Sequence, residues 1–187
     1  FEHVMDQALP LADWAGFEAR AAQSRARGLW RGLGVATFLE WTGGNVFEER
    51  VTVDVQADSI IEVYSAVNQM GQGIATSLAQ LVVDAFGVPI EQVRVVLGDT
   101  DRGNGFGSAG SRSLFTGGSA MRSGADKTIE EAKQLAAQAL EAAPEDIRYE
   151  AARFVVVGTD HAIGLFELAG QQESGHIFVD HTHTVAG

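Results

Sequence analysis

The chain has 187 residues, of which 45% are hydrophobic and 20% are charged, a composition typical of a globular protein. Its formal net charge is −12, and Lys127 and Lys133 are its only lysines, so it offers no basic stripe for nucleic acid or an anionic membrane. Because it contains no cysteine, it cannot form disulfides, thiolate metal sites, its own iron–sulfur cluster or a cysteine nucleophile.

The sequence shows no apolar run near the roughly 20 residues that span a bilayer, and no signal-peptide pattern. We therefore expect a cytoplasmic protein without a membrane span. The chain starts at Phe1 rather than methionine and ends in a polar run over residues 176–184. We expect it to be a piece of a longer polypeptide; a full protein lacking a few end residues is the alternative.

The first half of the sequence predicts one helix and three strands. The helix is expected over residues 1–26, and the strands over 33–40, 47–55 and 60–67. Pro10 lies where it would bend or restart the helix, so two helical parts are expected. Val51, Val53 and Val55 alternate with polar residues, which predicts a strand with one buried face. A turn at 57–59 joins this strand to the next in a hairpin or meander.

The second half predicts two helices, with strands between and after them. The helices are expected over 74–86 and from about 114 to 142, and the strands over 93–97, 154–157 and 163–168. An apolar stripe that includes Leu78 and Val82 supports the first helix, and Gly87 ends it. Residues 98–110 are too rich in glycine, aspartate and asparagine for a regular element. This order predicts an α+β (mixed α/β) fold in which helices pack a mixed sheet.

A first glycine motif, Gly71-Gln72-Gly73, lies between a predicted strand and the start of a predicted helix. Glycines there let a ligand approach the backbone closely, and the helix dipole favours a negative or oxo group. The Gln72 amide can donate and accept hydrogen bonds at once. Taken alone, the motif is more often a plain turn that needs glycine for its geometry.

A second glycine motif, Gly105–Gly110, has the spacing G-x-G-x-x-G. In a dinucleotide-binding fold this turn follows a strand directly, whereas here residues 99–104 intervene, so the match is weak. The segment is still a glycine-rich loop that leads into Ser111, Arg112 and Ser113. Their hydroxyls and guanidinium are groups suited to a phosphate or pyrophosphate.

Metal binding by the side chains is not expected. The segment Asp99–Asp101 begins like a calcium loop, but the twelfth position is Gly110 rather than glutamate. His181 and His183, with Asp180, could offer metal ligands, since two residues apart on a strand would put both histidines on one face. A solvated polar tail is the favoured interpretation of these three residues.

Other polar residues receive a structural interpretation. Glu40, Glu48 and Glu49 are interpreted as solvated charges or strand-edge features. No Ser–His–Asp set is assigned, because nothing in the sequence places a histidine beside a candidate serine.

Taken together, several motifs resemble the large, molybdenum-binding subunit of the molybdenum hydroxylases. This is the family of xanthine dehydrogenase, aldehyde oxidoreductase (aldehyde oxidase) and aerobic carbon monoxide dehydrogenase. The motifs are Met70-Gly71-Gln72-Gly73, Gly98-Asp99-Thr100-Asp101 and Gly110-Ser111-Arg112-Ser113, with further similarity in residues 1–14, in 27–34 and in Glu40 with Gly43-Gly44. The resemblance covers residues 1–168, expected to be a segment of the molybdenum-cofactor-binding domain. Residues 169–187 are expected to be a loop or linker cut from a longer chain.

The resemblance implies a molybdenum ion held by a pterin dithiolene, in bacteria usually molybdopterin cytosine dinucleotide. By this resemblance Gly71, Gln72 and Gly73 contact the pterin near the metal. The segment from Gly110 through Ser111 and Arg112 to Ser113 would hold the pyrophosphate or nucleotide end. The implied reaction is oxidative hydroxylation of an aldehyde or N-heterocycle, or oxidation of carbon monoxide, with water as the oxygen source.

The resemblance also implies partners that this chain lacks: the rest of the large subunit, an iron–sulfur subunit and an FAD subunit, in bacterial cytoplasm or alternatively periplasm. The Gly-Glu motif with the family's catalytic glutamate and the Phe-Arg-Gly motif of the substrate-side loop are both absent. We therefore assign no catalytic residue and no protein ligand to the metal. The isolated chain is expected to be inactive and to bind the cofactor weakly or not at all.

Two alternative functions remain at this stage. The first is a nucleotide-binding domain that uses Gly105–Gly110, which would require a strand ending just before Gly105. The second is a non-catalytic binding module that kept the fold and lost the cofactor. The small-molecule substrate is left open, because its pocket is formed largely outside this segment.

Overall fold

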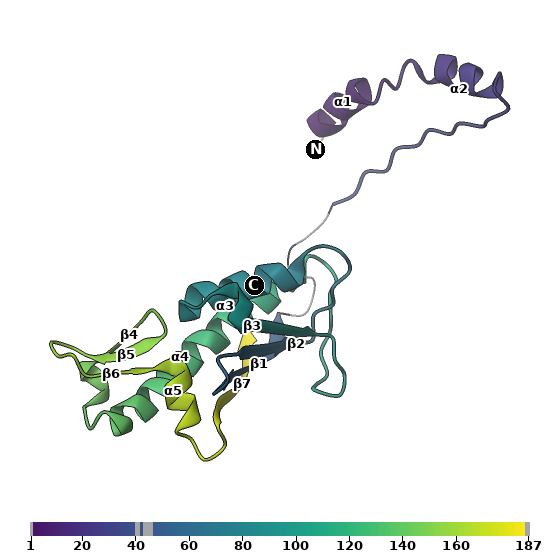
Figure 1. Cartoon of the computed structure of the whole chain (residues 1–187). Coiled ribbons are helices and arrows are strands. Elements are labelled where there is room, and N and C mark those ends of the chain that lie inside the picture. Colours follow the sequence, from purple (N-terminus) through teal and green to yellow (C-terminus); the bar gives the residue numbers. More distant parts are fainter. Residues whose placement is uncertain (1, 40–41, 43–46, 186–187) are drawn as a thin grey trace. The chain divides into compact units, whose positions relative to one another are not determined.

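The computed structural model describes residues 2–39, 42 and 47–185. The chain forms two compact units, Phe1–Glu40 and Trp41–Gly187, referred to below as unit 1 and unit 2 (Figure 1). The candidate site residues predicted from the sequence all lie in unit 2.

Unit 1 contains the two-part helix predicted around Pro10. Helix α1 spans Glu2–Leu11 and helix α2 spans Phe17–Arg25. Pro10 lies inside the last turn of α1, where it removes one backbone donor, and the helix ends one residue later. Helix α1 buries none of its residues, and α2 buries Ala21 and Ser24. The prediction of a bend or restart near the proline is confirmed.

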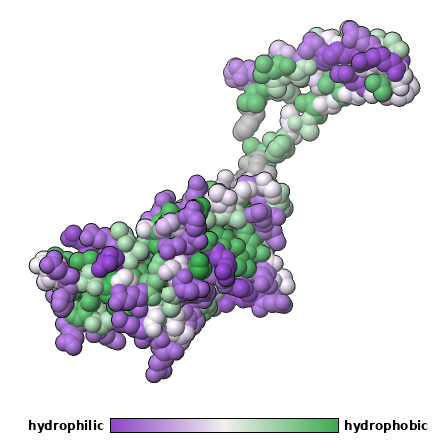
Figure 2. All heavy atoms as spheres, viewed as in Figure 1, coloured by the Kyte–Doolittle hydropathy of each residue, from purple (hydrophilic) through white to green (hydrophobic). Residues whose placement is uncertain are grey.

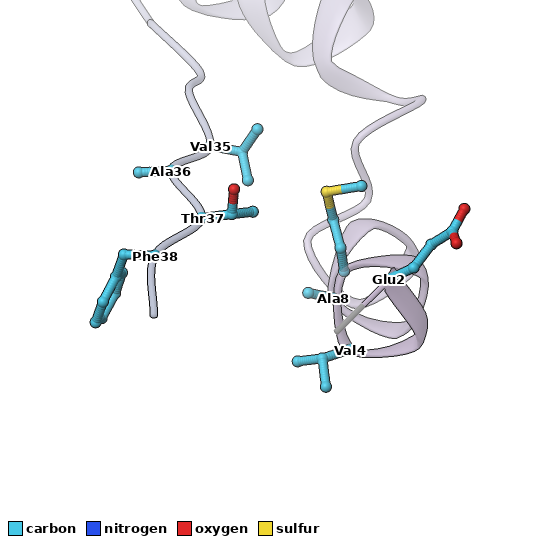
Figure 3. Close-up of a pocket in the computed structure, with 8 residues that line it drawn as sticks. Glu2, Val4, Ala8, Val35, Ala36, Thr37 and Phe38 are labelled. Atoms are coloured by element: carbon cyan, nitrogen blue, oxygen red, sulfur yellow. The ribbon is translucent and has the colours of Figure 1, made fainter. Parts of the chain in front are cut away.

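The strand predicted over 33–40 does not form in its described part, residues 33–39. No strand is present in the described residues of unit 1, so this segment has no hydrogen-bonding neighbour. Val35 and Phe38 are 58% and 82% exposed. An apolar groove of about 580 Å³ lies between α1 and residues 35–38, with Val4 and Ala8 on its helix side (Figure 3). Glu40, Gly43 and Gly44 lie outside the described residues.

Unit 2 is built on a four-stranded mixed sheet, which agrees with the predicted α+β class. Its strands are β1 (Glu48–Gln56), β2 (Ile61–Ser65), β3 (Val93–Leu97) and β7 (His176–Thr184), in the order β3-β2-β1-β7. Strand β1 pairs antiparallel with β2 and β7, and β2 pairs parallel with β3. Val51, Val53 and Val55 of β1 are fully buried, as their alternation predicts.

Strand β7 corrects the expectation of a loop or linker over 169–187. It pairs with β1 along its whole length, from the pair Gln56 and His176 to the pair Glu48 and Thr184. Only Ile177 and Val179 supply its buried apolar face. The more exposed face carries Asp180, Thr182 and Thr184, and His181 and His183 continue the inward face, so the polar composition made the strand look like a solvated tail.

Helices cover one face of the large sheet. Helix α3 spans Ile74–Phe86, as predicted, and Gly87 ends it with φ 67°. The helix predicted from about 114 to 142 is a one-turn π-helix, Ser113–Gly118, followed by α4, Ser119–Ala139. Helix α4 packs on β1 and β7. Gly124 permits the close approach, since a Cβ there would lie 2.9 Å from Val51 Cγ2.

A small antiparallel sheet completes unit 2, with strands β4 (Ile147–Glu150), β5 (Arg153–Val156) and β6 (Ala162–Gly164), and with short 3-10 helices at Ile90–Gln92 and Pro144–Asp146. The strand predicted over 163–168 is wrong beyond Gly164, where helix α5 (Leu165–Gly170) begins. Leu165, Leu168 and Ala169 are all buried, a spacing that suits one face of a helix rather than a strand.

The surface of the chain mixes polar and apolar residues (Figure 2). In the part of the chain that the structure describes, no helix has the length and apolar character needed to cross a membrane.

Candidate cofactor site

The two glycine motifs lie in two loops that leave the same edge of the large sheet. Residues 66–73, here called the first turn, follow β2 and lead into α3. Residues 98–113, here called the second loop, follow β3 and lead into the π-helix. Because β2 and β3 are neighbouring parallel strands, their carboxyl ends meet at one edge, where ligands of α/β sheets commonly bind. The fold thus brings together the two motifs singled out in the sequence.

The first turn exposes its backbone at two glycines. Gly71 and Gly73 have φ of +87° and +77°, the left-handed region that favours glycine. A Cβ added at either position would meet no atom within 4 Å. Gly73 is also the N-cap of α3 and has no side chain of its own to cap the helix, although Gln69 Oε1 accepts from the Ala75 N–H at 3.3 Å. Apart from the Ala75 N–H, which Gln69 caps, the start of α3 presents its first backbone N–H groups beside open space.

The Gln72 side chain folds back onto its own turn. Its Nε2 donates to the Asn68 carbonyl at 2.8 Å, and its Oε1 accepts from the Met70 N–H. Gln72 remains exposed, so its amide is within reach of a ligand that offers the same donor and acceptor pattern. In this structure the amide stabilises the turn itself.

The second loop is fixed against the sheet by strand side chains. The Tyr64 hydroxyl donates to the Gly103 carbonyl at 2.8 Å, and Arg50 Nη1 donates to the Arg102 carbonyl at 3.1 Å. Burial, the largest cause, raises the pKa of Tyr64, which keeps the hydroxyl protonated as a donor. Arg50 is itself held by Asp180, at 2.6 Å. These contacts place the loop over the outer face of β1 and β2.

The glycines of the second loop serve close packing. A Cβ on Gly105 would lie 2.2 Å from Ala66 Cβ, and a Cβ on Gly107 would lie 2.5 Å from Asn68 Oδ1. The loop therefore rests directly on the first turn. Gly105 and Gly107 face protein atoms, in contrast to the open glycines at 71 and 73.

Ser108 joins the two loops by hydrogen bonds. Its Oγ accepts from the Asn68 N–H at 2.8 Å and donates to the Asn68 carbonyl at 2.9 Å. It also accepts from the Ser113 hydroxyl at 2.7 Å. Because the same Asn68 carbonyl accepts from Gln72, one peptide connects residues of both predicted motifs.

Arg112 is fully buried and anchors the second loop to strand β1. Its guanidinium donates to the carbonyls of Gly107 at 2.6 Å and Glu48 at 2.8 Å, and to the Glu49 carboxylate at 2.9 Å. The Phe106 ring centroid lies 5.5 Å from its Cζ. We expected a guanidinium suited to a phosphate; here it binds protein acceptors instead. Neighbouring Ser111 is exposed, with φ 56°.

Glu49 corrects the interpretation of the strand glutamates as solvated charges. Glu48 is exposed, but Glu49 is buried and paired with Arg112. The signal was present in the sequence, because Glu49 lies in phase with Val51 and Val53 on the inward face of β1. A glutamate at such a position needs a buried partner.

The histidines of β7 lie apart from the two loops' hydrogen-bond network. His181 Nε2 lies 2.9 Å from Ser123 Oγ, a contact that the sequence could not show, and its ring centroid is 6.2 Å from that of His183. Asp180 pairs with Arg50. Among the described residues, no group of three or more potential ligands comes together to hold a metal ion.

A two-loop arrangement of this kind is suited to a domain that binds a large polar cofactor through backbone groups, amides and hydroxyls. Comparison with known proteins gives the family. The molybdopterin cofactor-binding domain model matches residues 7–185, and the chain belongs to this family. The resemblance to the large subunits of molybdenum hydroxylases is confirmed.

Three known proteins illustrate the similarity. The 6-hydroxypseudooxynicotine dehydrogenase complex subunit gamma of Paenarthrobacter nicotinovorans is 33% identical over 90% of this chain. The nicotine 6-hydroxylase large subunit of the same organism is 30% identical over 84%. A solved Cu,Mo-CO dehydrogenase, carbon monoxide reduced, has a TM-score of 0.70 at 23% identity, over 98% of this chain and 26% of that chain. This structural match shows the same fold. The chain spans 21% of the length of both curated relatives.

The residues present fit a pterin dinucleotide. Such a group is held by its pterin and phosphate ends, which need hydrogen-bond donors and acceptors and close access to the backbone. Gly71 and Gly73 supply the access, and the exposed Gln72 and Ser111 supply amide and hydroxyl groups. Which of these residues touch the cofactor stays a prediction.

Proposed function

We propose that this chain helps to hold the molybdenum–pterin cofactor within the large subunit of an oxidoreductase. The observation that carries the proposal is the joined pair of loops, with open space above Gly71 and Gly73. Site and family agree on the same class of ligand. When bound, the cofactor supplies a molybdenum centre for oxidative hydroxylation with water as the oxygen source.

The residues of the two loops divide the work of binding. Gly71, Gln72 and Gly73 contact the pterin end, where the N-terminus of α3 offers N–H groups to oxo or carbonyl oxygens. Gly110, Ser111 and Ser113 hold the pyrophosphate or nucleotide end. Arg112 acts through its buried contacts, because its guanidinium fixes the backbone on which these residues stand. The proposed form of the cofactor is molybdopterin cytosine dinucleotide.

The whole protein is proposed to work with iron–sulfur and FAD subunits and to act on an N-heterocycle. The name of the nicotine 6-hydroxylase relative supports this substrate class, since nicotine is an N-heterocycle. An aldehyde or carbon monoxide is the alternative substrate. The isolated chain is proposed to be inactive, because neither the Gly-Glu nor the Phe-Arg-Gly motif is within it.

The structure disfavours a separate nucleotide site at Gly105–Gly110. Gly105 and Gly107 are pressed against Ala66 and Asn68, so these glycines serve packing rather than phosphate access. The helix that follows begins with a π turn at Ser113, not directly after the glycine pattern.

The test is the molybdenum content of the complete polypeptide, purified from its own host and measured by elemental mass spectrometry. We expect about one molybdenum per chain in the native protein, and a large loss in Gln72→Ala and in Ser111→Ala. Gln138→Ala is the control, since this exposed glutamine lies on α4. A folded native protein without molybdenum would instead support a module that lost its cofactor.

A further inference from the structure

We infer that Glu49 is a positioning residue whose single buried carboxylate sets the position of both loops. The inference rests on the proposed function, since it concerns how the cofactor site is held ready. Glu49 lies near the start of β1, next to the edge from which the first turn and the second loop depart. Each of its two carboxylate oxygens serves a different loop.

The first oxygen, Oε1, holds the beginning of the first turn. It accepts from the Ser65 hydroxyl at 2.7 Å and from the Ala66 N–H at 3.0 Å. Ser65 Oγ in turn accepts from the Val67 N–H at 3.3 Å. These contacts continue the strand pairing into the turn, so residues 65–67 are fixed just before Asn68.

The second oxygen, Oε2, holds the end of the second loop through Arg112. The Nη2 atom of Arg112 lies 2.9 Å from Oε2, and its Nη1 donates to the Gly107 carbonyl at 2.6 Å. Gly107 is the residue that packs against Asn68. A continuous path of contacts therefore runs from Glu49 through Arg112 and back to the first turn.

Because the Glu49–Arg112 pair is buried, its contacts determine the relative position of the two loops. The side chains of Arg112 and Glu49 are 0% and 1% exposed. A buried charge must keep its partner, because water cannot replace it, and hydrogen bonds strengthen in a low dielectric. The two loops consequently adopt one relative position before any cofactor arrives. A site fixed in advance binds its ligand with less loss of entropy.

The first experiment measures amide hydrogen exchange in the complete polypeptide prepared without cofactor. In Glu49→Gln the side-chain amide has only one acceptor oxygen. It therefore cannot accept hydrogen bonds from Ser65 and Ala66 and, at the same time, from Arg112. We expect exchange in residues 98–113 to rise about tenfold or more, as for loss of a hydrogen bond to a charged group. Glu48→Gln is the matched control: it lies beside Glu49 but its side chain is exposed. Its exchange should match that of the parent protein.

A second variant covers the case in which Glu49→Gln fails to fold. Glu49→Leu combined with Arg112→Met removes both charges, and such replacements commonly preserve folding. We expect the sheet and α4 to keep their protection while residues 98–113 exchange faster. Unchanged protection of the second loop in this folded double variant would overturn the inference.

The third measurement separates this inference from the proposed function. The molybdenum–pterin content of the double variant is compared with that of the parent and of Glu48→Gln. Faster exchange together with loss of cofactor supports both proposals. Faster exchange with full cofactor retention leaves the positioning role intact and contradicts the assignment of these loops to the cofactor. Unchanged exchange overturns the positioning role, whatever the cofactor content.

Discussion

The first turn and the second loop both depend on glycine, but for opposite purposes. At Gly71 and Gly73 the missing side chain leaves open space and a left-handed backbone. At Gly105 and Gly107 the space that a side chain would need is already occupied by Ala66 and Asn68, respectively. Glycines of the first kind give a ligand access, whereas those of the second kind let two loops touch. A count of glycines cannot distinguish the two roles, but substitution can.

The largest effect is expected from Arg112→Met, which removes the support beneath the second loop. Glu49 is then left buried without its cation, and such an uncompensated charge costs about 3–5 kcal/mol. Urea unfolding measures the loss of free energy. Arg122→Met is the control, because its pair with Asp126 is about half exposed and should contribute less than about 1 kcal/mol. Equal effects of the two variants would contradict the buried support.

A smaller effect is expected from Gly105→Ala, which tests packing between the loops. Its Cβ would overlap that of Ala66 at 2.2 Å, so the loop must shift, and we expect a loss of about 1–3 kcal/mol. Adding Ala66→Gly should recover much of this loss, because it removes the opposing methyl group. Thermal or urea unfolding measures both variants. Failure of the second change to restore stability would show that the two residues do not oppose each other.

Gly71→Ala should cost less stability, about 1 kcal/mol, since only the left-handed backbone is strained. Its cofactor content should nevertheless fall strongly, because the methyl group enters the open space above the first turn. The control is Gly158→Ala in the turn between β5 and β6, where Gly158 has φ +80° and equally open surroundings. The comparison fails if both variants keep the same molybdenum content.

The smallest effect on stability is expected from the protonation of His181, which lies outside both loops. Burial, and then Lys127 and His183, lower its pKa below the usual 6.5. The unfolded chain therefore takes up the proton at higher pH than the folded chain. The free energy of unfolding should fall as the pH drops below about 6.5, by less than about 1 kcal/mol. Urea unfolding at several pH values should show a weaker dependence in His181→Asn; an unchanged slope would contradict this.

The sequence predicts the main elements of unit 2 well where a strong period and an end signal coincide. Helix α3, with Gly87 after it, is the clearest example. Strand β7 was missed because its composition is polar and because its partner strand, β1, is far away in the sequence. His176 of β7 and Asp54 of β1, whose side chains are in contact, are 122 residues apart in the chain. Strand 33–40 was predicted from local propensity, which has no effect without a neighbouring strand.

The sequence also places the site at the two glycine motifs, but not the role of each residue. The clash of Gly105 with Ala66 depends on how β2 and β3 align, which no local pattern contains. Arg112 suggested a phosphate contact, since a lone arginine beside serines is usually exposed. Only its position beneath the loop, next to Glu49, shows that it binds protein groups.

The separation between Glu49 and Arg112 has a consequence for the order of folding. The two residues are 63 positions apart in the chain, and β2, α3 and β3 lie between them. Their contact closes a long loop, so it forms late compared with the local hairpin of β1 and β2. Until then both charges remain in water and the loops stay apart. The finished geometry of the cofactor loops is thus reached only after the sheet has assembled, and a half-folded chain presents no complete site.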